Sequence, residues 1–349
     1  MRTECRNRES DGGRQGGALM QNTEKKELLR LEHVTKIYRD SRRSHVRAVD
    51  NLSLSVYEGE TLGLVGESGC GKSTTGNMLV HLLTADEGTI TFRGQDITHM
   101  KEREFHPLRR EIQMVFQDPY SSINPRKKLG WLLEEPLVIH RKDLTKEQRK
   151  EKVREMMRVV GLDEEYLNRY PKELSGGQRQ RISIALALIL NPAFIVADEP
   201  VSALDVSVQA QILNLMRTLQ KEYSLTYLFI SHDLNVVGYL SDRIGVMYLG
   251  HLVEIGTQEQ ITERAVHPYT QALFAAAGEE EDAGVGILEG DVPSPSNPPS
   301  GCPFHTRCRY CMEICKTEAP MLRTIEEGWQ AACHRISMPN QSENHGGSV

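Results

Sequence analysis

The fold of this chain is decided by one short stretch, Gly66-Glu67-Ser68-Gly69-Cys70-Gly71-Lys72-Ser73. It fits the pattern G-x-x-x-x-G-K-[ST], after an apolar run at 62–65 that is typical of a buried parallel strand and before a predicted helix from Thr74 to Leu83. Glycines let backbone N–H groups wrap phosphates, and the helix end and the Lys72 ammonium attract negative charge. The stretch therefore predicts a phosphate-binding loop, with Ser73 as a ligand of Mg²⁺. A glycine-rich turn with a chance lysine is the alternative.

Two adjacent carboxylates, Asp198 and Glu199, end a second apolar run at 194–197. Asp198 can hold Mg²⁺ through water, and Glu199 can orient or deprotonate a water that attacks a γ-phosphate. Alone, an acidic pair after a strand is often a solvated loop start. Together with the phosphate loop, the pair predicts a site that hydrolyses a nucleoside triphosphate.

Strand and helix patterns alternate along the rest of the chain. Thr145 and Gln148 form a capping-box pattern before a helical face that ends at Gly161. Further strand patterns lie at 28–34, 52–56, 228–230 and 244–248, and a further helical pattern lies at 208–219. This alternation predicts an α/β fold with a parallel sheet and a helical insert.

Composition limits the classes of function. The 349 residues include 42 Lys and Arg against 48 Asp and Glu, a net charge of −6, so no overall positive field attracts nucleic acid. The longest apolar stretch, 182–190, is about half of the roughly 20 residues that span a bilayer. The polar start of the chain lacks an apolar signal segment, which favours a reducing cytosol.

A third motif lies between the two halves of the predicted site, at Leu174-Ser175-Gly176-Gly177-Gln178-Arg179-Gln180-Arg181. Its serine and glycines expose N–H groups at the start of a predicted helix that runs to Leu190, which gives a second anion site. The motif resembles the signature of ATP-binding cassette (ABC) ATPases. The resemblance implies that each ATP is held between the phosphate loop of one subunit and the signature of another, in a head-to-tail dimer closed by ATP.

Other elements of that family follow in order. Tyr38 is similar to the residue that stacks on adenine, and Gln117 to the glutamine that touches Mg²⁺ and the attacking water. The segment 202–205 resembles the loop that communicates across the dimer, and His232 the switch histidine near the γ-phosphate. The resemblance implies an ABC-type P-loop NTPase with a RecA-like parallel core, an antiparallel β subdomain and a helical subdomain. The nucleotide contacts that it implies are Tyr38, Gly66, Ser68, Gly69, Cys70, Gly71, Lys72, Ser73, Thr74, Gln117, Ser175, Gly176, Gly177 and Gln178.

More specific strings narrow the branch of the family. Those at 121–126, 199–207, 247–250 and 267–270 resemble the ATPase subunits of bacterial oligopeptide and dipeptide importers. Gln178 and the segment 293–302 resemble the F-type subunit, which pairs with a different, D-type ATPase. The resemblance implies ATP-driven peptide uptake at the cytoplasmic face of the bacterial inner membrane, with two permease subunits and an external solute-binding protein as partners. A coupling helix of the permease would dock near 117–126.

Two other functions stay open at this point. A related importer could carry nickel, glutathione or another small solute, because the chain holds no cargo pocket that discriminates among them. A soluble ABC ATPase that acts on nucleic acid or ribosomes is the other alternative. Such proteins often carry two cassettes or a long coiled-coil insert, and this chain has one phosphate loop and no such insert, so we expect no nucleic-acid partner.

Cysteines crowd one end of the chain: five of the seven lie between Cys302 and Cys333. Four thiolates can hold an iron–sulfur cluster or a tetrahedral zinc ion, and the spacing does not select which four. The family pattern matches Cys302, Cys308, Cys315 and Cys333 and implies a [4Fe–4S] cluster, with Cys311 as the spare. Zinc, buried or disulfide-linked thiols without metal, and an interaction module are the alternatives.

These patterns predict four consecutive regions. Residues 1–27 form a disordered leader, and 28–270 the ABC nucleotide-binding domain with its helical subdomain at about 120–190. Residues 271–300, with an acidic run and several prolines, form a linker. Residues 301–349 form a Cys-rich C-terminal extension with a disordered tail.

Overall fold

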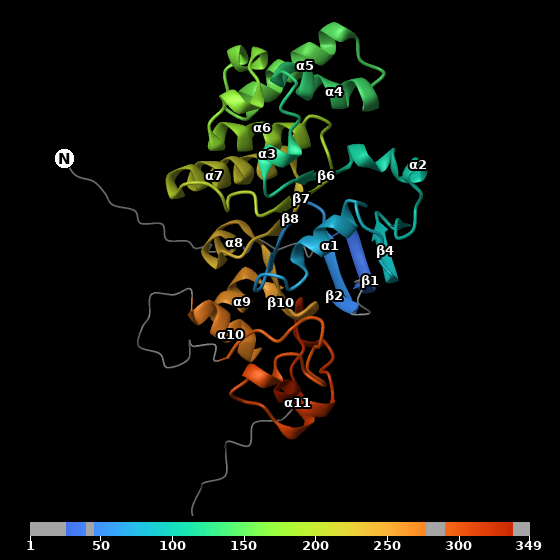
Figure 1. Cartoon of the computed structure of the whole chain (residues 1–349), viewed down its shortest axis with the longest axis vertical. Helices are drawn as coiled ribbons and strands as arrows, with labels where there is room; N and C mark the ends of the chain where they lie inside the picture. The colour runs from blue at the N-terminus through green and yellow to red at the C-terminus, as the bar shows by residue number, and fades with distance from the viewer. Residues whose placement is uncertain (1–25, 40–44, 277–289, 338–349) are drawn as a thin grey trace, which may run out of the picture.

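Two β-sheets and a helical insert make up the computed structural model, which describes residues 26–39, 45–276 and 290–337 (Figure 1). Nearly all of the predicted leader, part of the predicted linker and the end of the chain lie outside the described residues. Helices of the insert occupy one end of the molecule in Figure 1, and the C-terminal region occupies the other. The sheets lie between them.

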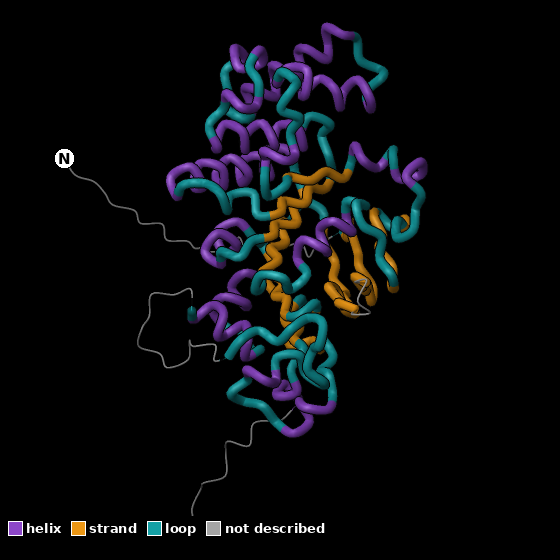
Figure 2. The backbone as a smooth tube through the Cα atoms, viewed as in Figure 1, coloured by secondary structure: helices purple, strands orange, loops and turns teal. Residues whose placement is uncertain are grey.

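The larger sheet has eight strands in the order β11-β12-β10-β9-β3-β8-β7-β6 and runs through the molecule as one band (Figure 2). Five neighbouring strands are parallel: β3 (Thr61–Val65), β6 (Ile112–Val115), β7 (Phe194–Asp198), β8 (Thr226–Ile230) and β9 (Arg243–Tyr248). Three antiparallel strands continue the sheet: β10 (His251–Thr257), β11 (Arg323–Glu326) and β12 (Trp329–Ala331). The sheet is therefore mixed. Every residue of β3, β7 and β8 is buried, which explains their continuous apolar runs.

The smaller sheet is antiparallel, in the order β2-β1-β4-β5. Its strands are β1 (Glu27–Arg39), β2 (His45–Tyr57), β4 (Glu87–Phe92) and β5 (Gln95–Asp96). One face of this sheet is buried. Its side chains include Leu29 and Leu31 of β1 and Leu52 and Val56 of β2. This alternation is typical of a sheet with one solvated face, and the buried face packs against α1 (Lys72–Leu79).

The helical insert leaves the large sheet after β6 and returns at β7. It contains α3 (Pro119–Ser122), α4 (Leu129–His140), α5 (Lys146–Val159) and α6 (Gly176–Leu188). The predicted capping box is confirmed: the Gln148 N–H donates to Thr145 Oγ1 at 3.3 Å, and the Thr145 N–H donates to Gln148 Oε1 at 2.8 Å. Leu133, Met157 and Ile182, one from each long helix, are fully buried and join the insert to the main core.

Six further helices lie outside the insert in the described residues, and the longest of them is α7 (Val206–Tyr223). The others are α2 (Glu102–Phe105), α8 (Leu234–Leu240), α9 (Gln258–Glu263), α10 (Pro268–Ala275) and α11 (Glu313–Thr317), with 3-10 turns at Leu108–Arg110, Glu164–Asn168, Pro171–Glu173, His305–Arg307 and His334–Ser337. Helix α10 crosses the boundary at residue 270 that the sequence predicts between domain and linker. Each helix in the described ranges is too short or too polar to cross a lipid bilayer.

The C-terminal region continues the large sheet, because β12 pairs with β10 at Glu254↔Ala331 and Ile255↔Gln330. Glu254 is fully buried, and its carboxylate accepts hydrogen bonds from Trp329 Nε1 at 3.0 Å and from the N–H groups of Val266 and His267. A single buried carboxylate thus ties β12 and the start of α10 to β10. The sequence patterns did not predict β11 and β12, which are only four and three residues long.

We expect Trp329→Ala to lower the free energy of unfolding by about 3 to 5 kcal/mol, because it leaves a cavity in the core and removes one donor from Glu254. Denaturant unfolding measures this change. Trp131→Ala is the matched control, because Trp131 is 44% exposed and the same substitution there creates no cavity. Equal losses in the two variants would contradict the role of Trp329 as a core anchor.

Candidate nucleotide-binding site

The predicted phosphate loop connects β3 to α1 and lies close against two neighbouring backbones. Gly66 has φ 146° and Gly71 has φ 104°. A Cβ atom at Gly66 would lie 2.2 Å from the Met247 carbonyl oxygen, and one at Gly71 would lie 2.2 Å from the Ala48 carbonyl oxygen. Both positions therefore require glycine, for the backbone angle and for the space.

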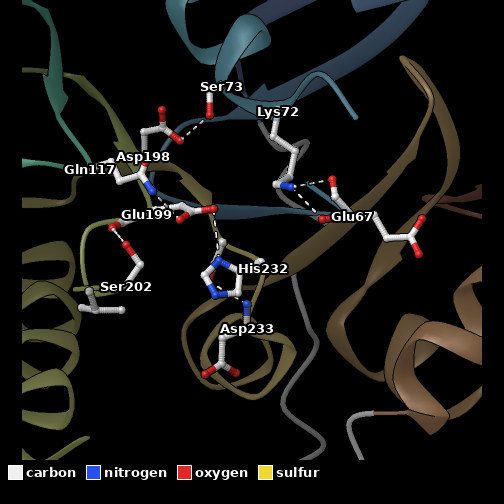
Figure 3. A network of polar contacts seen from close by, with 12 residues as sticks. Glu67, Lys72, Ser73, Gln117, Asp198, Glu199, Ser202, His232 and Asp233 are labelled. Carbon is white, nitrogen blue, oxygen red and sulfur yellow. Dashed lines mark hydrogen bonds and ion pairs between the residues drawn. The ribbon is translucent and has the colours of Figure 1, made fainter. Parts of the chain in front are cut away.

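Lys72 turns its side chain back into this loop (Figure 3). Its ammonium donates to the carbonyl oxygens of Gly66 at 2.6 Å and Glu67 at 3.2 Å, and the residue is only 6% exposed. These carbonyls compensate for the loss of water around a buried cation. The positive charge is thereby held at the loop, where the sequence predicts phosphate binding.

Asp198 lies at the end of β7 and faces the first turn of α1. Ser73 Oγ donates to Asp198 Oδ1 at 3.0 Å, although 125 residues separate them in the chain. Burial raises the pKa of the Asp198 carboxyl, and the hydrogen bond from Ser73 partly opposes that shift. The pair places a hydroxyl and a carboxylate oxygen together, and such oxygens are the ligands that Mg²⁺ prefers.

Glu199 is held between two polar side chains from other segments (Figure 3). Gln117 Nε2 donates to Glu199 Oε2 at 2.8 Å, and His232 Nδ1 lies 3.1 Å from Glu199 Oε1. Glu199 has φ 43°, in the left-handed region that non-glycine residues rarely adopt. Its backbone is fixed there by an N–H bond to the Ile230 carbonyl at 2.9 Å and by Ser202 Oγ, which donates to the Glu199 carbonyl at 3.1 Å. The carboxylate is therefore held in place by a strained backbone whose N–H and carbonyl groups are both hydrogen-bonded.

A cavity of about 470 Å³ opens over these groups. Its lining residues are Ala48, Ser68, Gly69, Gly71, Lys72, Ser73, Thr74, Gln117, Glu199 and His232. The fold thus brings together predicted residues from four distant segments. Ala48 is the member that sequence reasoning missed, because a small side chain on a strand carries no chemical signal.

Two of the nucleotide contacts predicted in the loop lie outside this lining. Gly66 packs on Met247 behind the loop, and Cys70 is 4% exposed beneath it. Burial raises the pKa of the Cys70 thiol, and the nearby Lys72 ammonium opposes this shift. A protonated thiol here is a small apolar side chain that supports the loop.

The predicted signature lies at the start of α6, away from the cavity lining. Ser175 and Gln178 form a capping box, with Ser175 Oγ accepting from the Gln178 N–H at 3.3 Å and Gln178 Oε1 accepting from the Ser175 N–H at 3.0 Å. Gln178 Nε2 also donates to Tyr166 Oη at 3.0 Å. Gly176 is exposed, and a Cβ at Gly177 would lie 2.5 Å from a methyl group of Val208 on α7.

Tyr38, the predicted adenine-stacking residue, lies near the end of β1 and is 42% exposed. It does not line the cavity either. The roles predicted for Tyr38 and for residues 175–178 therefore stay predictions for a nucleotide complex or a dimer.

The C-terminal cysteines do not form the predicted metal site. Within the described ranges, no three His, Cys, Asp or Glu side chains are grouped to hold a metal ion. Cys302 and Cys315 are 8% exposed in the main core, and Cys308 packs against it. Burial raises the pKa of the Cys302 thiol to about 12.

The prediction of a [4Fe–4S] cluster on Cys302, Cys308, Cys315 and Cys333 is therefore wrong, and the same finding gives no support to zinc. The cysteines in the described part of the chain are free thiols. The physical reason is that a cysteine pattern alone does not distinguish metal ligands from small apolar side chains that fill a core.

Two family models match the chain. The model described as ABC transporter matches residues 49–202, and the model described as oligopeptide/dipeptide transporter, C-terminal region, matches residues 253–315. The chain is 51% identical over 298 residues to the oligopeptide transport ATP-binding protein AppF of Bacillus subtilis, covering 84% of this chain and 90% of that relative. The chain belongs to the ABC transporter ATPase family.

Other relatives agree with this assignment. The ABC ATPase is 49% identical over 282 residues to the oligopeptide transport ATP-binding protein OppF of Salmonella typhimurium, covering 79% of this chain and 84% of the relative. Among solved structures, it is similar to the dimeric post-hydrolysis state of the ATP-binding cassette MJ0796 bound to ADP and Pi. That match has a TM-score of 0.61 and 31% identity and covers 66% of this ABC ATPase and 99% of the neighbour.

Proposed function

We propose that this ABC ATPase is the ATP-hydrolysing subunit of an importer of dipeptides or oligopeptides. Two observations together support the proposal. The cassette and the C-terminal region each match a transporter family model, and the chain is 51% and 49% identical to two oligopeptide transport ATP-binding proteins. Its polar groups also form the constellation that ATP hydrolysis needs, with a buried cation at a glycine loop and an anchored carboxylate opposite.

Hydrolysis at this site transfers the γ-phosphoryl group of ATP to water and yields ADP and phosphate. Ser73 and Asp198 would hold Mg²⁺, with Gln117 nearby, and the ion would neutralise charge on the phosphates. Glu199 orients the attacking water and accepts its proton, while Gln117 and His232 fix the carboxylate. Lys72 and the N–H groups of residues 68–74 bind the phosphates.

A head-to-tail dimer would complete the site. The signature at 175–178 exposes a helix N-terminus outside the cavity lining, so a second cassette must supply the corresponding N–H groups. The solved neighbour, the dimeric post-hydrolysis state of MJ0796, is consistent with this arrangement. We propose that the second cassette is a D-type ATPase subunit, and that ATP closes the dimer and hydrolysis reopens it.

The partners of the complex would be two permease subunits at the cytoplasmic face of the inner membrane, fed by an external solute-binding protein. A docking surface is available next to Gln117: Phe116 is 38% exposed and Tyr120 is 65% exposed. Exposed aromatic side chains are typical anchors of protein interfaces. Because Gln117 also bonds Glu199, a coupling helix seated here would act directly on the hydrolytic site.

We propose that residues 290–337 stabilise the cassette as a Cys-rich C-terminal extension rather than form an independent module. The support is structural: β11 and β12 continue the central sheet, and Cys302, Phe304 and Cys315 belong to the main core.

Purification of the full chain from membranes tests the proposed function. We expect it to recover two polytopic permease subunits and a second, non-identical ATPase, and we expect disruption of the complex to abolish uptake of labelled dipeptides or oligopeptides. Recovery with ribosomes or DNA would contradict the proposal. Normal peptide uptake with loss of nickel or glutathione uptake would contradict the peptide assignment alone.

A further inference from the structure

We infer that Arg307, in the C-terminal region, is a positioning residue for the phosphate loop and acts through Glu67. The inference rests on the proposed nucleotide site and adds a residue that lies 240 positions away in the chain from the loop it contacts. Arg307 belongs to the 3-10 turn His305–Arg307, within the segment that carries the first cysteines. No motif of the sequence connects it to the loop.

The contact itself is short and shielded from water. Arg307 Nη1 donates to Glu67 Oε1 at 3.1 Å and to Oε2 at 2.9 Å. The Arg307 side chain is 6% exposed and that of Glu67 is 23% exposed. An ion pair this buried differs from a surface pair, because removal of one partner leaves a charge that water does not stabilise.

Glu67 is held on its backbone as well. Its N–H donates to Tyr269 Oη at 3.0 Å, and Tyr269 is fully buried in α10. Tyr269 and Phe304 pack with ring centroids 5.3 Å apart, and Tyr248 packs against both. Glu67 is thus held at two points: Arg307 of the C-terminal region binds its side chain, and Tyr269 of α10 accepts from its peptide N–H. The aromatic cluster supports both contacts.

Glu67 lies in the loop at a position that contacts the phosphate-binding cation. Glu67 follows Gly66 directly, and its carbonyl oxygen is one of the two that hold the Lys72 ammonium. Fixing Glu67 therefore fixes a hydrogen-bond partner of the phosphate-binding cation. Arg307 also neutralises a carboxylate next to the place where several phosphate charges would bind, and without it the two negative groups would repel each other.

Nucleotide binding to the full chain tests the inference, with displacement of a fluorescent ATP analogue by Mg-ATP as the measurement. We expect Arg307→Met to weaken ATP binding by about 10- to 100-fold. We expect kcat at saturating ATP to change by less than about threefold, since Arg307 touches no reacting group. The double variant Glu67→Gln with Arg307→Met removes both charges, and we expect its affinity to return to within about threefold of wild type.

Lys316→Met is the matched control, because it removes one positive charge from the same region while its partner Glu313 is exposed. We expect it to bind ATP as the wild type does. An unchanged affinity in Arg307→Met would overturn the inference. A double variant as weak as the single variant would also overturn it, because general loss of packing would then explain the effect. A wild-type chain that binds no nucleotide would overturn the proposed function itself.

A second measurement on the wild type needs no variant to fold. Because coupling between two sites is reciprocal, Mg-ATP should slow amide hydrogen exchange in residues 302–311 if that segment positions the loop. Exchange in residues 323–331, which pair with β10 rather than with the loop, is the internal reference. Equal exchange of residues 302–311 with and without nucleotide would overturn the inference.

Discussion

Glu199→Gln is expected to lower ATP turnover by about 10² to 10⁴-fold while ATP binding stays within about threefold of wild type. The amide keeps the shape of the side chain but cannot accept a proton from the attacking water. Gln117 and His232 contact this carboxylate, whereas the phosphates are bound by Lys72 and the loop, so we expect the substitution to separate hydrolysis from binding. Steady-state phosphate release measures turnover, and displacement of a fluorescent nucleotide measures binding.

Glu263→Gln is the control, because Glu263 lies exposed at the end of α9 and undergoes the same chemical change. It should hydrolyse ATP at the wild-type rate. Turnover within about threefold of wild type in folded Glu199→Gln protein would remove Glu199 from the catalytic role and would direct attention to His232, a neutral base in the same cavity lining when unprotonated.

Lys72→Met is expected to impair ATP binding itself, in contrast to Glu199→Gln. We expect the affinity for ATP to fall by about 10²-fold or more. Each charge-assisted hydrogen bond to phosphate contributes about 1.5 to 3 kcal/mol, and 1.4 kcal/mol corresponds to a tenfold change in affinity. Methionine keeps most of the length of the lysine side chain and its apolar stem but carries no charge. Equilibrium binding of Mg-ATP to the full chain measures the loss.

Lys221→Met on α7 is the matched control, because Lys221 is exposed and the substitution removes the same charge at a position away from the site. We expect its affinity to equal that of wild type. If Lys72→Met bound ATP normally, the hydrogen bonds from Lys72 to Gly66 and Glu67 would be structural, and the loop N–H groups alone would bind the phosphates.

Much of the site could be predicted because its chemistry is encoded in short segments. The loop 66–73, the carboxylates Asp198 and Glu199, Gln117 and His232 are each recognisable in their own segment, and parallel strands bring such segments to one edge of a sheet. The capping box at Thr145 was likewise predictable, since all of its hydrogen bonds lie within four residues.

The cysteines show where this reasoning fails. Cys302, Cys308 and Cys315 have a spacing that suits metal ligands, yet they lie in or against the apolar core as free thiols. Whether thiols are buried in the core or grouped around a metal ion depends on the surrounding fold and leaves no mark in the spacing.

The sequence by itself determined the phosphate loop, the acidic strand end and the membership of the ABC family, because these depend on residues within a few positions of each other. Only the tertiary structure decided that Ser73 bonds Asp198, that β12 joins the central sheet and that Arg307 forms an ion pair with Glu67. Those contacts join residues 75 to 240 positions apart. Long-range contacts of this kind follow from the packing of the whole core, which no local pattern records.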